Sequence, residues 1–382
     1  MKRKIAVIAS SRATYGYKRR LIGLIEASPK LELQLIVTGM HLLHEYGYSI
    51  RDIEADGYPI AAKVEMMVGG DSASAWAKSL GVEIQNLAQV FSMLNPDIVL
   101  VTGDRAEMFA ATVTAAYMSI PVAHIQAGDL SGHIDGSARH AITKLAHIHL
   151  PSCEDSAERV KKMGEEEWRI FNVGAPQLDD IVKDERMSRK ELSRALNIDF
   201  SKPVLVVVQH AVLTEIAQVS SQIRATMEAV KNTGHSTIVI YPNVDAAGRE
   251  IIAVIREYER LPQIHVFSNL SRKRFLSVLA YASALIGNSS AGILEAPSFK
   301  LPAINIGTRQ KGRMRAVNVI DVKKFERDMI AEAIEQALVN DEYRSALSEC
   351  INPYGDGYSS ERICKILEEA NLQQLREKMM TY

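Results

Sequence analysis

Polar side chains that could do chemistry gather most densely in residues 122–149. That segment holds five of the ten histidines: His124, His133, His140, His147 and His149. An apolar run there is followed by three glycines and then a helical pattern, in which Asp135 stands four residues before Arg139. Asp135 could cap that helix, pair with Arg139 or face a ligand. No histidine has the two-ligand helical spacing of a zinc site, so most are expected on the surface or in the core.

Two further polar groups each follow an apolar run. Asp104 and Arg105 come after residues 98–102, and His210 comes after residues 204–208. Ligand-binding groups collect at the carboxyl ends of strands in open α/β sheets, and histidine is the side chain that titrates nearest neutral pH. These residues are therefore site candidates, with a surface ion pair and a structural histidine as the alternatives.

Residues 287–295, with the sequence GNSSAGILE, indicate a phosphate-binding loop. Small residues let a phosphate approach the backbone, and a helix start offers unpaired N–H groups. Ser289 and Ser290 add hydroxyl donors, and Glu295 could accept both hydroxyls of a ribose. Arg309 and Arg313 follow the next apolar run and could supply cations. The alternative is a plain helix cap followed by surface charges.

Several common chemistries lack their motifs in this chain. GxGxxG, GxxxxGK[ST], HExxH and GxSxG are all missing, and the three cysteines show no CxxC spacing. The sequence therefore predicts no metal site and no bound cofactor.

Short apolar runs alternate with helical patterns along the chain, as is typical of strands buried on both faces of a parallel sheet. The expected strands are 5–9, 33–38, 60–64, 98–102, 122–125, 148–150, 170–173, 204–208, 237–240, 264–267, 284–286 and 303–306. Helices are expected at 73–94 and 106–118, and a linker at 184–202. The pattern predicts two α/β domains, residues 1–184 and 185–360. A terminal helix in 361–382 could pack back on the first domain.

Composition narrows the partners and the location. The 45 Lys and Arg residues balance 46 Asp and Glu residues, which leaves no basic excess to bind a nucleic acid backbone. Only five apolar residues precede Ser10 in the opening segment, too few for a signal peptide or a membrane span. We therefore expect a cytoplasmic protein without nucleic acid or membrane partners.

Many segments, in order along the chain, resemble the hydrolysing UDP-N-acetylglucosamine 2-epimerases of sialic-acid-type pathways. The matching segments are Arg12-Ala13-x-Tyr15, Thr38-Gly39-x-His41-Leu42, Gly103-Asp104-Arg105, His124-Ile125, Ile134-Asp135, 137–145, His147, Gln209-His210, Tyr241-Pro242-Asn243-x-Asp245, 287–290, Glu295 and 305–313. The resemblance implies the GT-B fold, with two Rossmann-like doubly wound domains and a UDP-sugar in the central cleft. A homodimer or homotetramer is expected.

The family reaction eliminates UDP across C1–C2 to give a 2-acetamidoglucal, and water addition then releases the free 2-epimerised sugar. By the resemblance, the catalytic residues would be Asp104, Asp135, Arg139, His210 and Gln126. The substrate-binding and UDP-binding residues would be Arg12, His41, Arg105, His124, His147, Asn243, Ser289, Ser290, Gly292, Glu295, Arg309 and Arg313.

Two departures from the family pattern leave the base and the substrate open. Thr14 replaces an aspartate that is common after Arg-Ala, and the second departure is at Gln126. Many members carry an acid where this chain has Gln126, and an amide cannot transfer a proton at neutral pH. The base is then Asp104, Asp135 or, less readily, Asp129. Alternatively, the substrate differs, for example a 4-acetamido-6-deoxy relative of UDP-N-acetylglucosamine used for legionaminic acid. A GT-B glycosyltransferase and a non-catalytic nucleotide-sugar sensor are the rival functions, while a metal hydrolase has no supporting ligand spacing.

Overall fold

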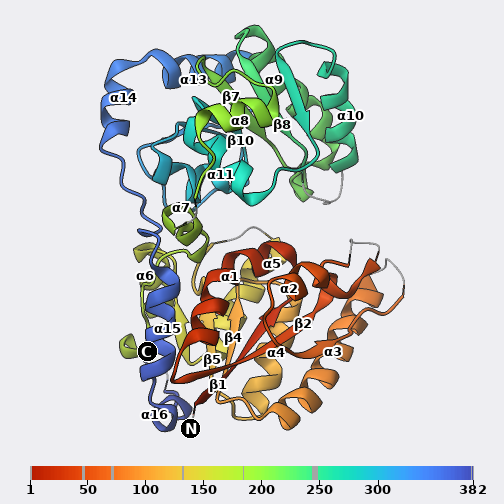
Figure 1. The fold of residues 1–382 in the computed structure, drawn as a ribbon, viewed down its shortest axis with the longest axis vertical. Helices are drawn as coiled ribbons and strands as arrows, with labels where there is room; N and C mark the ends of the chain where they lie inside the picture. The colour runs from red at the N-terminus through yellow and green to blue at the C-terminus, as the bar shows by residue number, and fades with distance from the viewer. Residues whose placement is uncertain are drawn as a thin grey trace. The chain divides into compact units, whose positions relative to one another are not determined.

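The computed structural model divides the chain into two compact units, Met1–Asp180 with Tyr354–Tyr382, and Ile181–Pro353 (Figure 1). The described residues are 2–44, 48–69, 73–130, 133–183, 185–242, 248–379 and 381, without the side chains of Arg12, Ala13, Ala73, His133, Ile134, Asp135 and Leu213. The sequence placed the domain boundaries at 184 and 360. In the structure the units change at 180 and 353 instead, since the chain from Tyr354 onward belongs to the first unit.

The first unit contains a parallel sheet of six strands in the order β3-β2-β1-β4-β5-β6. The strands are β1 (Arg3–Ala9), β2 (Leu31–Thr38), β3 (Ile60–Val64), β4 (Ile98–Thr102), β5 (Val122–Ile125) and β6 (Ile148–Leu150). Ile5 of β1 pairs with Leu33 on one side and Ile98 on the other. The strand order reverses between β1 and β4, and ligands of doubly wound sheets bind outside the carboxyl ends at that point.

Helices cover both faces of this sheet, because alternate residues of each strand point to opposite sides. Ile5 and Val7 join the core with helices α1 (Arg12–Ala27), α2 (Ile50–Ala55), α15 (Ser359–Glu369) and α16 (Leu372–Arg376). Ala6 and Ile8 join the core with helices α3 (Ala73–Leu94), α4 (Ala106–Tyr117) and α5 (His133–Leu145). Helices α6 (Glu154–Lys162) and α7 (Asp179–Lys183) follow β6. Figure 1 shows α15, near the end of the chain, lying beside α1.

The second unit repeats the same strand order, β12-β11-β10-β7-β8-β9. Its strands are β7 (Val204–Val208), β8 (Ser236–Ile240), β9 (Ile264–Phe267), β10 (Ala284–Gly287), β11 (Ala303–Ile306) and β12 (Val319–Val322). The order reverses between β7 and β10, where Val208 pairs with Gly287. The prediction of two Rossmann-like doubly wound units is confirmed.

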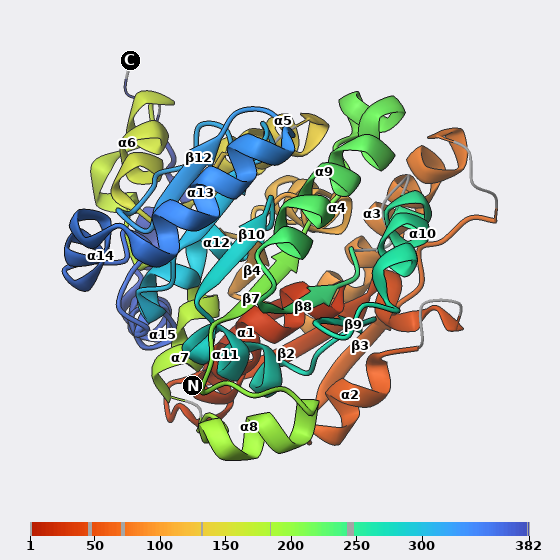
Figure 2. The ribbon, with the colours of Figure 1, turned by 90° about the horizontal axis from the view of Figure 1, so that it is seen from above.

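Two groups of helices cover the second sheet (Figure 2). One core contains residues of α9 (Val219–Asn232), α10 (Gly248–Tyr258) and α13 (Arg327–Val339). The other contains residues of α8 (Arg189–Leu196), α11 (Arg272–Tyr281) and α12 (Ala291–Leu294). Helix α14 (Asp341–Ser348) follows α13. Helix α8 lies within the predicted linker, but Leu192 and Leu196 are buried, so this segment is part of the second unit.

Two strand predictions differ from the structure. Residues 170–173 form only an isolated bridge, between His149 and Ile170, and Phe171 and Asn172 are exposed. Strand β12 was not predicted, because it is a partly exposed edge strand with Asp321 among its four residues. Its sequence therefore lacks the continuous apolar run of the inner strands.

Candidate active site

Asp104 directly follows the glycine turn at the carboxyl end of β4, where the first sheet reverses its strand order. Gly103 makes this turn with a φ of +79°, and its N–H donates to the carbonyl of Ile125 (3.0 Å). Arg139 of α5 forms an ion pair with Asp104 and also donates to the main-chain carbonyl of Gln126 (3.0 Å). The exposed fractions of these side chains are 6% for Arg139 and 18% for Asp104. Arg139 therefore joins the ends of β4 and β5 and fixes the Asp104 carboxylate.

His124 supports this turn from the interior of the sheet. Its Nε2 lies 2.8 Å from the carbonyl of Gly103, and its Nδ1 lies 3.1 Å from the hydroxyl of Thr143. A carbonyl can only accept, so Nε2 carries the proton. The Thr143 hydroxyl lies between the His124 Nδ1 and the main-chain carbonyl of Arg139, to which it donates (3.0 Å). Burial lowers the pKa of His124 to about 3, so the ring is neutral. His124 contacts the candidate site through Gly103, which makes it a support for the Asp104 turn.

Gln126 lies beside Asp104 in an uncommon backbone conformation. Its φ is +63°, in the left-handed region that costs a non-glycine residue about 1 kcal/mol. The N–H of Gln126 donates to Leu150 (2.9 Å), and a Cβ on Gly103 would stand 3.5 Å from the Gln126 Oε1. The side chain therefore faces the Asp104 turn. Asp129, the less favoured base, accepts hydrogen bonds from Ser152 at both carboxylate oxygens (2.7 and 2.6 Å).

Arg105 and His41 lie at the same edge of the sheet, after β4 and β2. Arg105 donates to both carboxylate oxygens of Glu107 (3.1 and 2.9 Å) and reaches the Sδ of Met40 (3.6 Å). His41 is buried, with its Nδ1 2.8 Å from the hydroxyl of Ser49. Sequence reasoning missed the buried Glu107, although its position two residues after Arg105 was an available signal.

Glu83, another residue that the sequence analysis missed, is buried on α3 with its carboxyl group against Thr38. The Thr38 hydroxyl lies 2.9 Å from both Glu83 Oε1 and the carbonyl of Val64. The Thr38 hydroxyl donates to both oxygens, and its hydrogen bond to the carboxyl group only partly offsets the effect of burial on the Glu83 pKa. Burial and the nearby charge of Glu107 raise the pKa of Glu83 to about 8. Glu83 is therefore a neutral acid at neutral pH.

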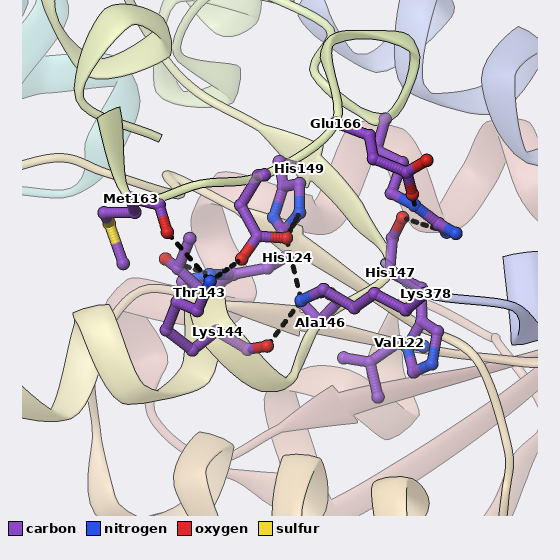
Figure 3. A network of polar contacts seen from close by, with 12 residues as sticks. Val122, His124, Thr143, Lys144, Ala146, His147, His149, Met163, Glu166 and Lys378 are labelled. Atoms are coloured by element: carbon purple, nitrogen blue, oxygen red, sulfur yellow. Dashed lines mark hydrogen bonds and ion pairs between the residues drawn. The ribbon is translucent and has the colours of Figure 1, made fainter. Parts of the chain in front are cut away.

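Two more histidines of the 122–149 cluster, His147 and His149, lie in a polar network that includes Lys378 (Figure 3). His147 accepts the N–H of Val122 (3.2 Å) at the amino end of β5, the edge opposite Asp104. His149 lies 2.9 Å from Glu165, which also pairs with Lys144 (2.6 Å) and Lys378 (2.8 Å). Burial lowers the pKa of His147 to about 4. This placement favours a structural role for His147 over contact with substrate.

The second unit presents its candidate residues at the end of β7 and in the loops after β10 and β11. His210 follows β7 and is 7% exposed, and its main chain is bound by the side chain of Asn288 after β10. Burial, with the nearby charge of Arg309 as a second cause, lowers the pKa of His210 to about 3. His210 is therefore a neutral imidazole. Arg309, after β11, donates to the main-chain carbonyl of Asn288 (3.2 Å).

The serine loop after β10 leads into a helix, α12, of only four residues. The hydroxyl of Ser289 accepts the N–H of Ala291 (3.3 Å) at its start. Gly292 packs against β11, where a Cβ would stand 3.2 Å from the Cβ of Ala303. Glu295, predicted to bind a ribose, is paired with Arg272 of α11. Sequence reasoning missed Arg272 because it lies 23 residues upstream on another helix.

The remaining predicted residues are described only in part. Asn243 and the side chains of Arg12 and Asp135 lie outside the described residues. The main chain places Arg12 at the start of α1, whose capping residue Ser11 accepts the N–H of Thr14 (3.4 Å). Ser290 is the N-cap residue of α12, and the main-chain N–H of Arg313 donates to the carbonyl of Gln310 (3.3 Å).

Among the residues that the structure describes, no helix is both long and apolar enough to cross a membrane. Within the same residues, no three His, Cys, Asp or Glu side chains gather in a way that could hold a metal ion.

Comparison with known proteins gives the family. Residues 24–368 match the family model for UDP-N-acetylglucosamine 2-epimerase. The chain is 36% identical, over 100% of both chains, to the UDP-N,N'-diacetylbacillosamine 2-epimerase (hydrolyzing) of Legionella pneumophila. It is 33% identical to the GDP/UDP-N,N'-diacetylbacillosamine 2-epimerase (hydrolyzing) of Campylobacter jejuni, over 87% of this chain and 88% of that one.

Solved structures agree with the two-unit fold. The structure of the Neisseria meningitidis UDP-GlcNAc 2-epimerase bound to UDP-GlcNAc has a TM-score of 0.83, with 19% identity over 96% of this chain and 100% of that chain. The Staphylococcus aureus MnaA–UDP structure has a TM-score of 0.80, with 21% identity over 100% of both chains. The fold is therefore GT-B-like, as the resemblance implied. Because the family model matches residues 24–368, most of this chain, the chain belongs to the UDP-N-acetylglucosamine 2-epimerase family.

Proposed function

We propose that this chain is a hydrolysing 2-epimerase whose substrate is a UDP-linked 2-acetamido sugar. The products would be UDP and the free manno-configured sugar, a precursor for nonulosonic acids such as legionaminic acid. The observation that carries the proposal is the Asp104–Arg139 pair, a largely buried carboxylate fixed at the strand reversal of the first sheet. The family membership gives this arrangement its reaction class.

The first step would be elimination of UDP. A carboxylate takes the proton from C2, the C2–H electrons form the C1=C2 double bond, and UDP leaves with the electrons of the C1–O bond. The C2 proton is not acidic by itself, so it can leave only as C1 gains cationic character. A positioned base contributes about 10²–10⁴-fold to such a step. Asp104 and Asp135 are the candidate proton-transfer groups.

The leaving diphosphate needs hydrogen-bond donors and positive charge. Arg309 supplies a cation, Ser289 and Ser290 supply hydroxyls, and the neutral His210 can donate a hydrogen bond without adding charge. Each preorganised donor can be worth about 3–4 kcal/mol in a transition state. The second unit would therefore hold UDP, and Arg272 would orient Glu295 toward the ribose.

The second step would be addition of water to the 2-acetamidoglucal. A hydroxide equivalent binds C1, and a proton returns to C2 on the opposite face of the sugar ring. One carboxyl group must then give a proton where another took one. We assign the pair Asp104 and Asp135 to these two transfers. Gln126 would contribute a hydrogen bond from its amide, since it cannot exchange a proton.

For the sugar itself, we propose the 2,4-diacetamido-2,4,6-trideoxy compound UDP-N,N'-diacetylbacillosamine rather than UDP-N-acetylglucosamine. The support is the full-length 36% identity to the Legionella pneumophila enzyme of that name. The amide at Gln126 is consistent with a sugar pocket that differs from the common acid-bearing one.

Release of UDP tests both parts of this proposal. The purified protein is incubated with each of the two UDP-sugars at equal concentration, without an acceptor, and UDP is measured over time. We expect UDP release from both sugars or from the diacetamido sugar alone, with a higher kcat/KM for the latter. A higher kcat/KM for UDP-N-acetylglucosamine would overturn the substrate assignment. No release of UDP from either sugar would overturn the assignment of epimerase activity.

A further inference from the structure

The loops that carry His210, Ser289 and Arg309 meet at one buried residue of the second unit, Asn288. Asn288 is 1% exposed and directly follows β10. Its side chain and its main chain make different contacts, and each contact ties a different loop to the same point.

The Asn288 side chain extends the pairing of β7 and β10 by one residue. Its Oδ1 accepts the main-chain N–H of His210 (2.7 Å), and its Nδ2 donates to the main-chain carbonyl of His210 (2.9 Å). An amide side chain offers one face with a donor and an acceptor, as a neighbouring peptide group would. The pair of bonds fixes where the chain of His210 lies after the strand has ended.

The Asn288 main chain holds the loop after β11. Its carbonyl accepts from the side chain of Gln310 (2.8 Å) and from Arg309 (3.2 Å). A second tie runs in parallel, since the hydroxyl of Thr308 donates to Glu215 (2.8 Å), in the segment that follows His210. The neutral His210 and the cation of Arg309 are thus held relative to each other across the serine loop.

We propose that Asn288 is a positioning residue for the departing diphosphate: it acts through His210 and does not itself touch the substrate. This inference rests on the proposed function, because it assigns His210 and Arg309 to the leaving group. Charge develops on the diphosphate as the C1–O bond breaks, so misplacing His210 lowers kcat more than it raises KM. The free product UDP carries that charge fully and must lose affinity as well.

The test compares Asn288→Asp and Asn288→Ala with the wild type. An aspartate keeps an acceptor for the His210 N–H but turns a second oxygen toward the His210 carbonyl, so it repels the loop that asparagine holds. We expect both variants to lower kcat/KM by about tenfold or more, mostly in kcat, and to weaken UDP binding measured by calorimetry. Wild-type kinetics and wild-type UDP affinity in both variants would overturn the proposal.

Gln34→Glu is the matched control. Gln34 is a buried amide on β2 of the first unit, 5% exposed, and it donates to the carbonyl of Leu94 (3.0 Å). The same exchange of amide for acid there should lower stability and leave kcat/KM and UDP affinity unchanged. If Asn288→Asp behaves like this control, its role is only structural and the proposal is wrong.

A double-mutant cycle separates action through His210 from general damage. If Asn288 acts by placing His210, the double variant His210→Ala, Asn288→Asp loses no more kcat/KM and no more UDP affinity than His210→Ala alone. Additive losses would overturn the proposal. The UDP affinities in this cycle are measured without turnover, so they decide the role of Asn288 even if neither UDP-sugar is a substrate. Failure of both UDP-sugars as substrates would count against the proposed function alone.

Discussion

At the scale of single residues, the catalytic proposal depends on how Arg139 holds Asp104. The guanidinium pairs with the carboxylate and binds the carbonyl of Gln126, so the two strand ends that flank the candidate base cannot move independently. His124 adds a third contact, because its Nε2–H donates to the main-chain carbonyl of Gly103. A base fixed in this way loses little entropy when the substrate arrives.

Removing the charge of Asp104 should therefore stop proton transfer and spare the fold. We expect Asp104→Asn to lower kcat by about 10²–10⁴-fold with UDP affinity retained, as measured by UDP release and calorimetry. Asp97→Asn is the control, because Asp97 precedes β4 at the opposite edge of the sheet and accepts the N–H of Lys4 (2.8 Å). Near-normal turnover by Asp104→Asn would mean that the base lies elsewhere.

Glu83 should make stability depend on pH. Its carboxyl pKa is about 8 in the folded protein against an ordinary value of 4.5. Between these values the folded state keeps a proton that the unfolded state releases, so the free energy of unfolding falls as the pH rises. A glutamine does not titrate, so the free energy of unfolding of Glu83→Gln should rise by roughly 2–4 kcal/mol relative to that of the wild type between pH 4.5 and pH 8.

Denaturant unfolding at several pH values measures this gain. The control is Glu26→Gln, at an exposed position, and its free energy of unfolding should change with pH in the same way as that of the wild type. If the free energy of unfolding of Glu83→Gln also follows that of the wild type across this pH range, Glu83 is ionised in the folded protein.

Sequence reasoning found the residues that follow strands and missed those that act on them from elsewhere. Asp104, His210 and Ser289 stand two or three residues after the end of an apolar run, and that position alone marks them. Glu83 and Arg272 lie on helices far along the chain from Thr38 and Glu295, the residues they bind. Such pairs exist only once the fold is formed, so spacing carries no sign of them.

At the scale of elements, the close approach of β7 and β10 determines where the candidate residues of the second unit stand. Gly287 ends β10 with a φ of +128°, and a Cβ there would lie 2.2 Å from the carbonyl of Val208. Only glycine permits the strands to meet at this point, one residue before Asn288 binds the main chain of His210.

A methyl group at this glycine should therefore separate the strands. We expect Gly287→Ala to lower the free energy of unfolding by roughly 3 kcal/mol or more, since the clash is with backbone. Gly234→Ala is the control: its φ is +68° and nothing lies within 4 Å of a Cβ there, so it should cost only about 1 kcal/mol. Equal losses in urea unfolding would show that the β7–β10 approach is not the reason for glycine.

The inner strands could be predicted from sequence, while β12 and α8 could not be assigned correctly. An inner parallel strand is apolar on both faces, as Val204–Val208 is, and this pattern needs no knowledge of its neighbours. Helix α8 reads as a charged linker because only Leu192 and Leu196 face the core. A helix with so narrow an apolar side is recognised only by what it packs on.

At the scale of the whole molecule, the two ends of the chain belong to one unit. Ile363, Leu367 and Leu375 lie in the same core as β1. The N–H groups of Ser359 and Ser360 donate to the carboxylate of Asp179 (2.9 and 2.8 Å). The first unit is therefore incomplete without residues 354–382, whereas the second is one continuous stretch.

This arrangement predicts unequal behaviour of fragments. We expect residues 181–353 to fold alone with a cooperative thermal transition by circular dichroism, and residues 1–180 to fold only when a peptide of residues 354–382 is added. The reason is the loss of the α15 and α16 side chains from the core, each worth about 2–5 kcal/mol. Cooperative folding of residues 1–180 without the peptide would contradict it.

The most direct test of the proposed chemistry is to run the reaction in D₂O. UDP-N,N'-diacetylbacillosamine is incubated with the protein without an acceptor, and the free sugar is analysed by NMR and mass spectrometry. We expect UDP together with a manno-configured sugar that carries one deuterium at C2, because the C2–H bond must break before the proton returns from solvent. A free sugar with hydrogen at C2, or with its original configuration, would contradict elimination and leave simple hydrolysis.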